Sequence, residues 1–187
     1  FDTKNRDKPW GTTDAVCSIK NIIDCPFVIC NGDDIYGENT FKILLNHLQK
    51  SEEGATIGYK LKDAIPETGK VKRGIFIENK GYVKSIVETF NIEKNNLSAL
   101  GLTENSMCSQ NIFAMHPVDV DNLNKIATEF KEKNKGNRTI ELLLPVDITS
   151  LIEAGKLKLK VYSTPDKWIG ITNPEDEDVV REMLKNS

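Results

Sequence analysis

Two adjacent carboxylates, Asp33 and Asp34, close the run Asn-Gly-Asp-Asp that directly follows the apolar segment at residues 26–30. Hard divalent cations such as Mg²⁺ prefer oxygen ligands, and on nucleotides they commonly take one or two carboxylates together with phosphate oxygens and water. The run therefore predicts a metal and phosphate site. Asn, Gly and Asp also favour turns and helix caps, so a purely structural role explains the same residues equally well.

Residues 9–14, with the sequence Pro-Trp-Gly-Thr-Thr-Asp, form a second candidate segment. Gly11 and Thr12 stand at the start of a predicted helix, whose first N–H groups can approach a nucleotide. Gly-Thr-Thr alone is weak support for a nucleotide site. Trp10 and Trp168 are expected to pack in the core rather than to stack on a base.

The elements that must position these residues alternate between strand and helix periodicity. Apolar, β-branched runs predict strands at residues 27–30, 55–60, 74–77, 82–87, 109–115 and 157–162. Helical spacing predicts helices at residues 12–23, 37–49, 118–130, 140–154 and 175–184. This alternation is typical of an α/β fold with a parallel or mixed sheet. Asp33 and Asp34 then lie beyond the carboxyl end of a strand, where open α/β sheets bind ligands.

Four local expectations accompany this outline. Thr12 or Thr13 is expected to cap the first helix, and the strand at residues 27–30 is expected to be buried on both faces. The Asn-Lys-Gly sequence at residues 79–81 is expected to close a hairpin. The polar stretch at residues 91–105 predicts a loop that either borders a substrate cleft or is ordinary surface.

The composition narrows the class of protein. With 187 residues, 39 % of them hydrophobic, the chain is long enough for one well-buried domain and short for two. Its 25 basic and 28 acidic residues are dispersed and give a net charge of −3, which argues against a nucleic-acid partner. No apolar run approaches the roughly 20 residues that span a bilayer, so no membrane association is expected.

The cysteines and the N-terminal residues bear on the compartment. Cys17, Cys25, Cys30 and Cys108 show no Cys-x-x-Cys pair and no histidine at zinc spacing, so they are expected to be small buried residues in a reducing compartment. Residues 1–8 lack the features of a secretory signal. We therefore expect a cytoplasmic protein.

Taken together, the sequences KPWGTTDAV at residues 8–16 and PFVICNGDDIYG at residues 26–37 resemble the middle of a sugar-phosphate nucleotidyltransferase. Residues 81–88, 143–145 and 166–176 agree with that family in the same order, so the resemblance covers nearly the whole chain. It implies a Rossmann-like, three-layer α/β/α sandwich similar to A-type glycosyltransferases, with a mixed, mostly parallel sheet. It also implies an enzyme that joins an NTP to a sugar 1-phosphate or a similar phosphorylated acceptor and releases pyrophosphate.

The resemblance assigns roles to individual residues. Asp33 would hold the catalytic Mg²⁺ with Asp34 beside it, and Gly11 and Thr12 would lie against the nucleotide base. Three further residues would face the acceptor sugar, namely Glu88, Ser109 and Asn111.

Some positions depart from the family pattern. The glycine-rich, Arg-containing loop that cradles the triphosphate is expected before Phe1. Either residues 1–187 are one N-terminally truncated domain, which we favour, or the gene product lacks the loop; in both cases we expect these residues to be inactive alone. Thr89 stands where many relatives carry a lysine that meets the sugar phosphate, and Lys94 is the hypothesised substitute. Gly170 stands where many relatives carry a second metal-binding aspartate, and the nearby Asp166 is better explained by a turn.

Two alternatives to the nucleotidyltransferase therefore stay open. One is a glycosyltransferase that binds a nucleotide-sugar and a divalent cation through the same acidic turn, although that class would lack the Pro-Trp-Gly-Thr segment. The other is a non-catalytic relative that binds a nucleotide or a sugar.

Overall fold

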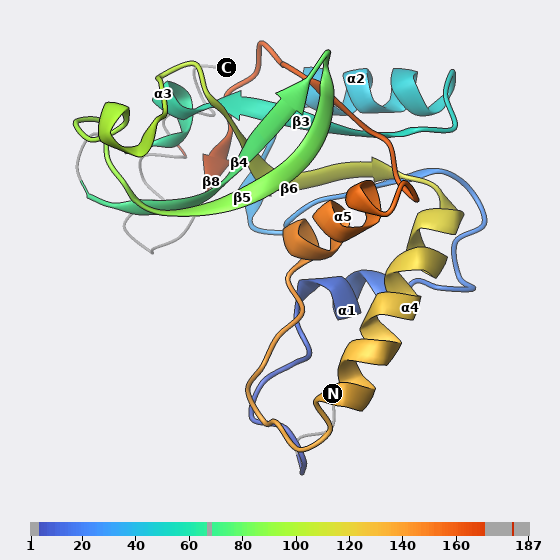
Figure 1. The fold of residues 1–187 in the computed structure, drawn as a ribbon. Coiled ribbons are helices and arrows are strands. Elements are labelled where there is room, and N and C mark those ends of the chain that lie inside the picture. The colour runs from blue at the N-terminus through green and yellow to red at the C-terminus, as the bar shows by residue number, and fades with distance from the viewer. Residues whose placement is uncertain (1–3, 67–68, 171–180, 182–187) are drawn as a thin grey trace.

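The computed structural model describes residues 4–66, 69–170 and 181 of the chain. Its centre is a six-stranded mixed sheet with the strand order β1-β6-β3-β7-β5-β4. The strands are β1 (Phe27–Ile29), β3 (Gly54–Lys60), β4 (Val71–Asn79), β5 (Tyr82–Ile92), β6 (Met107–Met115) and β7 (Leu159–Tyr162). Strand β4 also pairs with β6, so the long β4–β5 hairpin bends back toward the middle of the sheet (Figure 1).

The expected α/β class with a mixed sheet is confirmed. In the described residues β3 and β7 run parallel and the other pairings of the sheet are antiparallel, so the parallel share is smaller than expected. A separate two-stranded ladder joins β2 (Asp34–Ile35) to β8 (Ile169–Gly170). This ladder links the acidic turn to the far end of the described chain.

Helices cover both faces of the sheet (Figure 1). Strand β6 shows how the layers form: Phe113 enters the core beneath α4 and α5, whereas its neighbour Ile112 enters the core beneath α2. Alternating side chains of one strand thus serve two cores, which gives the expected three layers. The helices are α1 (Thr12–Cys17), α2 (Glu38–Leu48), α3 (Leu61–Ala64), α4 (Pro117–Lys133) and α5 (Leu144–Glu153), with a 3₁₀ turn at Ser98–Leu100.

Helix α1 is shorter than its apolar spacing predicted. It was expected over residues 12–23 but contains six residues, after which the chain turns and Asn21 adopts a left-handed conformation with φ 63°. Asparagine tolerates that region better than most residues, and its left-handed conformation prevents the helix from continuing to residue 23 as the apolar residues predicted. Gly11 is the N-cap and neither Thr12 nor Thr13 caps the helix, so that expectation is wrong.

Helix α5 also differs from its predicted bounds. The helix expected over residues 140–154 begins at Leu144, because Pro145 lies in its first turn, where a missing N–H costs no hydrogen bond. Of the helix expected over residues 175–184, all but Arg181 lies outside the described residues. Within the described part of the chain, no helix is long and apolar enough to cross a membrane.

Strand β1 lies at the edge of the sheet, antiparallel to β6, and its residues are only half-buried. The expectation of a strand buried on both faces is therefore wrong. The cysteines divide in the same way: Cys17 and Cys108 are buried as expected, whereas Cys25 and Cys30, which flank β1, are exposed. The edge position of β1 explains the exposure of both flanking thiols.

The β4–β5 hairpin is confirmed and is longer than predicted. Lys80 and Gly81 form its two-residue turn with φ values of 53° and 78°. Two positive φ values in succession are those of a type I′ turn, which matches the right-handed twist of the strands.

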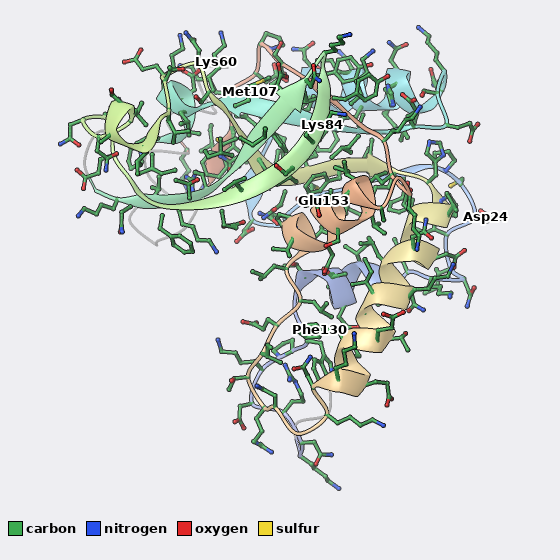
Figure 2. The ribbon with its side chains drawn as sticks, in the orientation of Figure 1. Asp24, Lys60, Lys84, Met107, Phe130 and Glu153 are labelled. Carbon is green, nitrogen blue, oxygen red and sulfur yellow. The ribbon has the colours of Figure 1, made fainter. Side chains whose placement is uncertain are left out.

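The N-terminal segment lies beside residues 137–142, which Figure 1 shows as blue and orange chains running together. The buried Arg6 holds the two segments, because its Nη2 donates to the carbonyl of Ile140 at 2.5 Å. Its guanidinium also lies 3.6 Å from the centroid of the Trp10 ring. Trp10 in turn packs edge-to-face on Phe130 of α4, labelled in Figure 2. These contacts fix the start of α1 and confirm the packing role of Trp10.

Candidate functional site

A cavity of about 450 Å³ opens where the N-terminal ends of α1 and α5 meet the acidic turn and the strands β4, β5 and β6. Gly11 is the predicted site residue that does not line it. The stretch at residues 91–105 contributes none of the described lining residues, which favours its interpretation as ordinary surface. The predicted site residues that the fold brings together here are Thr12, Asp33, Asp34, Glu88, Ser109 and Asn111.

The two carboxylates of the acidic turn differ in their surroundings. Asp33 is exposed, and its side chain makes no hydrogen bond or ion pair with any described residue. Asp34 is half-buried, and its Oδ2 accepts a hydrogen bond from Asn31 Nδ2 at 2.9 Å. The same oxygen lies 3.1 Å from the hydroxyl of Tyr36. Asp34 is therefore held in place, whereas Asp33 is open to a ligand.

Tyr36 holds this turn in place through hydrogen bonds. Its buried hydroxyl accepts the backbone N–H of Asn31 at 3.1 Å and lies 2.7 Å from the carbonyl oxygen of Gln110 on β6. Burial raises the pKa of Tyr36 well above its ordinary value, so the hydroxyl keeps its proton. That proton can bond either Gln110, which ties the acidic turn to β6, or Asp34, which fixes the carboxylate.

The start of α1 is packed tightly against the segment before α5. Gly11 has φ 108°, and a Cβ atom there would lie 2.1 Å from the carbonyl oxygen of Leu142. Glycine is therefore required at this position by both conformation and space. Next to it, Thr12 Oγ1 accepts the backbone N–H of Leu144 at 3.0 Å. The hydroxyl proton of Thr12 remains available to a ligand in the cavity.

A buried hydrogen bond joins the two helices behind their N-terminal ends. Thr13 Oγ1 donates to Asp147 Oδ2 at 2.5 Å, and both residues are buried. Burial raises the pKa of the Asp147 carboxyl, and the bond from Thr13 opposes that rise. The bond fixes α1 against α5, so Thr12 and Pro145 keep their places in the cavity wall.

The opposite wall is built from β4, β5 and β6. Gly74 pairs with Glu88 on one side and with Ser109 on the other, which brings these two side chains to one place. The register of β3 and β6 shifts between Ser109 and Phe113, and the intervening Asn111 has φ 55°. Such a bulge redirects a side chain that a regular strand would point elsewhere.

No family model and no curated protein matches the chain, but solved structures do. A Bacillus anthracis protein assigned as a glucose-1-phosphate thymidylyltransferase, in complex with sucrose, matches 97 % of this chain with a TM-score of 0.64 and 12 % identity. HddC from Yersinia pseudotuberculosis, complexed with GMP-PN, matches 96 % with a TM-score of 0.57 and 16 % identity. CTP:phosphocholine cytidylyltransferase (LicC) from Streptococcus pneumoniae matches 94 % with a TM-score of 0.56 and 9 % identity. The chain has the fold of the sugar-phosphate nucleotidyltransferases.

The nucleotidyltransferase fold confirms the architecture that the two sequence motifs implied. The chain spans 64 % of the length of each of these three solved chains. At identities this low, the likeness carries the fold and no assignment of individual residues. The chemistry of the site therefore has to be argued from its own side chains.

Several lining residues were not predicted from the sequence. Two are cations on β4, Lys72 and Arg73, and a third is Trp168, which was expected only to pack. Lys94, the hypothesised partner of an acceptor phosphate, is not among the described lining residues. Thr89 pairs with Arg73 across the β4–β5 hairpin, so positive charge near Thr89 comes from the neighbouring strand. Only the pairing of the strands reveals this arrangement.

Asp166 has the structural role that was favoured for it. Its carboxylate accepts hydrogen bonds from Asn39 Nδ2 at 2.8 Å and from the backbone N–H of Thr40 at 3.1 Å, both in the first turn of α2. The bond from Asn39, followed by those from the backbone, holds the pKa of Asp166 below its ordinary value. Asp166 therefore stabilises the start of α2 and does not line the cavity.

The donor set for a cation consists of Asp33 and Asp34. No group of three or more His, Cys, Asp or Glu side chains with metal-binding geometry occurs within residues 4–66 and 69–170. Two carboxylates alone do not form an all-protein cage. They do suit Mg²⁺ that keeps several waters and completes its coordination with substrate phosphates.

Proposed function

We propose that this protein is a nucleotidyltransferase, which transfers an NMP group from an NTP to a sugar 1-phosphate or a similar phosphorylated acceptor and releases pyrophosphate. The observation that carries the proposal is the single cavity that joins the acidic turn to Thr12 on one side and to Glu88 and Ser109 on the other. Two substrates that must react with each other need such a shared space. The fold supports the same reaction class.

In this reaction an oxygen of the acceptor phosphate attacks the α-phosphorus of the NTP. The bond from the α-phosphorus to the bridging oxygen breaks, and pyrophosphate leaves with the electron pair. The attacking oxygen is already an anion, so the step needs charge neutralisation and alignment more than an acid or a base. A site built from carboxylates, hydroxyls and two cations, with no histidine among its described lining residues, suits that demand.

Asp33 and Asp34 would hold Mg²⁺, which neutralises phosphate charge when it is bound. Asp34 is suited to this role because Asn31 and the Tyr36 hydroxyl fix its carboxylate. Asp33 is suited because its carboxylate has no competing partner among the described residues.

The two substrates would occupy different walls of the cavity. Thr12, Leu143 and Pro145 give the α1 and α5 side one hydroxyl and two apolar surfaces, which fits a nucleoside. Glu88, Ser109 and Asn111 give the strand side a set of polar groups, which fits the hydroxyls of a sugar. Gly11 would not contact the nucleotide; its close packing would hold the next residue, Thr12, in the cavity wall.

The test is pyrophosphate release by the full-length protein, measured with each of the four NTPs against a panel of sugar phosphates. We expect turnover with at least one pair and a loss of about a hundredfold or more in kcat/KM for Asp33→Asn. Asp63→Asn is the matched control, because Asp63 is an exposed carboxylate in α3 that does not line the cavity. Wild-type turnover by Asp33→Asn would refute the metal assignment.

Two other outcomes would overturn the proposed reaction. Hydrolysis or transfer of a nucleotide-sugar without use of an NTP would indicate the glycosyltransferase alternative. Binding of a nucleotide or sugar phosphate without any turnover would indicate the non-catalytic relative.

A further inference from the structure

Strand β4 brings two consecutive cations, Lys72 and Arg73, to the wall of the cavity. On a regular strand, neighbouring side chains point to opposite faces of the sheet. Two consecutive residues therefore line one cavity only where the strand pairing is irregular. The irregularity is a bulge in β5: Val71 pairs with Ile92 while Arg73 pairs with Thr89, and Asn91 between them has φ 56°. Such a bulge increases the local twist of the hairpin, which lets two consecutive residues of β4 line the same cavity.

Arg73 is a half-buried cation whose partners are all uncharged. Its Nε and Nη2 donate to the carbonyl of Ala64 at 3.3 and 3.0 Å, and its Nη1 donates to the carbonyl of Lys72 at 3.0 Å. No carboxylate among the described residues lies within ion-pair distance of it. A guanidinium carries five N–H donors, so two remain beyond those three bonds.

The surroundings of Arg73 favour an anionic ligand. Its guanidinium carbon lies 5.1 Å from the centroid of the Trp168 ring, which shields it from water. Burial lowers the pKa of Arg73 because it disfavours the charged form. A half-buried charge whose hydrogen-bond partners are all neutral costs free energy, and a bound anion would add to the opposing effect of the Asp34 charge.

Lys72 precedes Arg73 in β4, and its ammonium group has more hydrogen-bond donors than its contact with Glu88 uses. Its Nζ lies 3.0 Å from Glu88 Oε2 and 4.9 Å from the centroid of the exposed Phe90 ring. The Lys72 side chain is 46 % exposed, and the residue lines the cavity, so a solute in the cavity can reach this side chain. An ammonium has three donors, and it can therefore bind a ligand anion while it keeps Glu88.

We propose that Lys72 and Arg73 form an anion subsite that binds the phosphate group of the acceptor. The inference rests on the proposed function for the identity of the ligand, and on the two cations for its chemistry. The planar guanidinium suits two oxygens of one phosphate, and the ammonium suits the third. Glu88 and Ser109 flank Gly74, the next residue of β4, so hydroxyls of the same acceptor would meet them.

The assignment to the acceptor rather than to the NTP follows from the position of the subsite. Lys72 and Arg73 lie on the strand wall, on the same hairpin as Glu88. Thr12, the residue suited to the nucleoside, comes from the helix wall. A phosphate at Lys72 therefore belongs to the ligand that Glu88 contacts.

The first experiment measures binding of inorganic phosphate to the full-length protein by titration calorimetry, with EDTA present so that no metal contributes. We expect wild type to bind phosphate, and we expect the affinity of Lys72→Gln for phosphate to be lower by at least about tenfold. Lys72→Arg should restore most of the affinity. Lys70→Gln is the matched control, because Lys70 also forms an ion pair across the hairpin, with Glu93 at 3.5 Å, but does not line the cavity.

The subsite is refuted if wild type does not bind phosphate, or if Lys72→Gln binds it as tightly as Lys70→Gln does. Thermal unfolding of each variant separates a local loss of binding from misfolding, and Lys72→Arg tests the site even if Lys72→Gln is unstable. Phosphate binding without pyrophosphate release would leave the subsite standing and refute the nucleotidyltransferase.

The second experiment separates the two substrates in an active preparation. Lys72→Gln should raise the KM for the phosphorylated acceptor about tenfold or more and leave the KM for the NTP within twofold. The reverse pattern would place the subsite on the NTP and overturn the assignment to the acceptor.

Discussion

Asp34 and Gly170 are direct partners in the short β2–β8 ladder. A Cβ atom at Gly170 would lie 3.1 Å from Asp34 Oδ1, and 2.5 and 2.6 Å from two ring carbons of Trp168. The indole thus occupies the space that any side chain at position 170 would need. The place of Trp168 in the cavity wall and the glycine at position 170 are therefore coupled, and a carboxylate at position 170 would displace the indole.

Replacement of Gly170 by alanine should force the indole of Trp168 out of place. We expect Gly170→Ala to lower the free energy of unfolding by about 1–3 kcal/mol, as overpacking commonly does. Urea unfolding measures the stability, and tryptophan emission reports the indole. Gly136→Ala is the control, because no atom lies within 4 Å of a Cβ built there. Equal stability of the two variants would contradict the packing described.

Gly11 should be more sensitive still, because it combines a positive φ with contact to backbone. Gly11→Ala is expected to cost at least about 3 kcal/mol in the free energy of unfolding. Gly101→Ala separates the two causes, since Gly101 has φ 70° but open space around it. Conformation alone should cost about 1–2 kcal/mol there. Similar losses at the two positions would show that contact with Leu142 adds nothing.

The parts of the fold that the sequence predicted are those with a local signal. The Lys80-Gly81 turn and the acidic residues after β1 are encoded within a few positions. Helix α1 was overestimated because the apolar pattern continues to residue 23, whereas the helix ends at Cys17 and the left-handed Asn21 keeps the following turn from resuming it. The order of strands and the share of antiparallel pairs depend on contacts between distant segments, which a local pattern does not specify.

The candidate site divides in the same way. Asp33 and Thr12 stand in short motifs, whereas Lys72 and Arg73 look like ordinary strand residues in the sequence. Their role depends on the bulge at Asn91 and on the pairing of β4 with β5 and β6. When strand pairing and a bulge bring a charged residue to a cavity, the sequence around that residue contains no motif that reveals its place.

Substitution of the two carboxylates of the acidic turn should affect metal binding at both positions but the free energy of unfolding mainly at Asp34. Asp33→Ala is expected to change the free energy of unfolding by no more than about 0.5 kcal/mol, because Asp33 is exposed and has no described partner. Asp34→Ala should cost about 1–3 kcal/mol, because Asn31 and Tyr36 lose an acceptor. Both variants should weaken Mn²⁺ binding, followed by electron paramagnetic resonance. Retained Mn²⁺ affinity in both would remove the acidic turn from the metal site.

The buried carboxyl of Asp147 should make stability depend on pH. Burial raises its pKa above the ordinary 3.8, with the Thr13 hydrogen bond opposing, so the folded state holds this proton more tightly than the unfolded state does. The contribution of Asp147 is therefore present below pH 3.8 and is lost as the pH rises through the folded-state pKa.

Asp147→Asn tests this directly, because the amide oxygen still accepts the bond from Thr13. The stability of Asp147→Asn relative to wild type should rise as the pH is raised from below 3.8 toward neutrality, as measured by urea unfolding. Asp119, whose pKa is also raised by burial, is present in both proteins and cancels in the difference. A difference that is flat with pH would show that Asp147 does not titrate in this range.

The four cysteines should react with a disulfide reagent in two classes. Cys25 and Cys30 are exposed and should react within the native protein. Burial raises the pKa of Cys17 and of Cys108 to about 11, so these thiols are both inaccessible and protonated and should react only after unfolding. Burial and the nearby Asp34 also raise the pKa of Cys30, so Cys25 should be the faster of the exposed pair.

The measurement is the release of the coloured thiolate with time, in native buffer and then in denaturant. Cys25→Ser should remove the fast native phase and Cys30→Ser the slower one, which assigns each phase to one residue. Reaction of all four thiols in native buffer would show that the cores beneath α1 and beneath β6 open readily. Reaction of none would contradict the edge position of β1, because that position is what exposes the two thiols beside it.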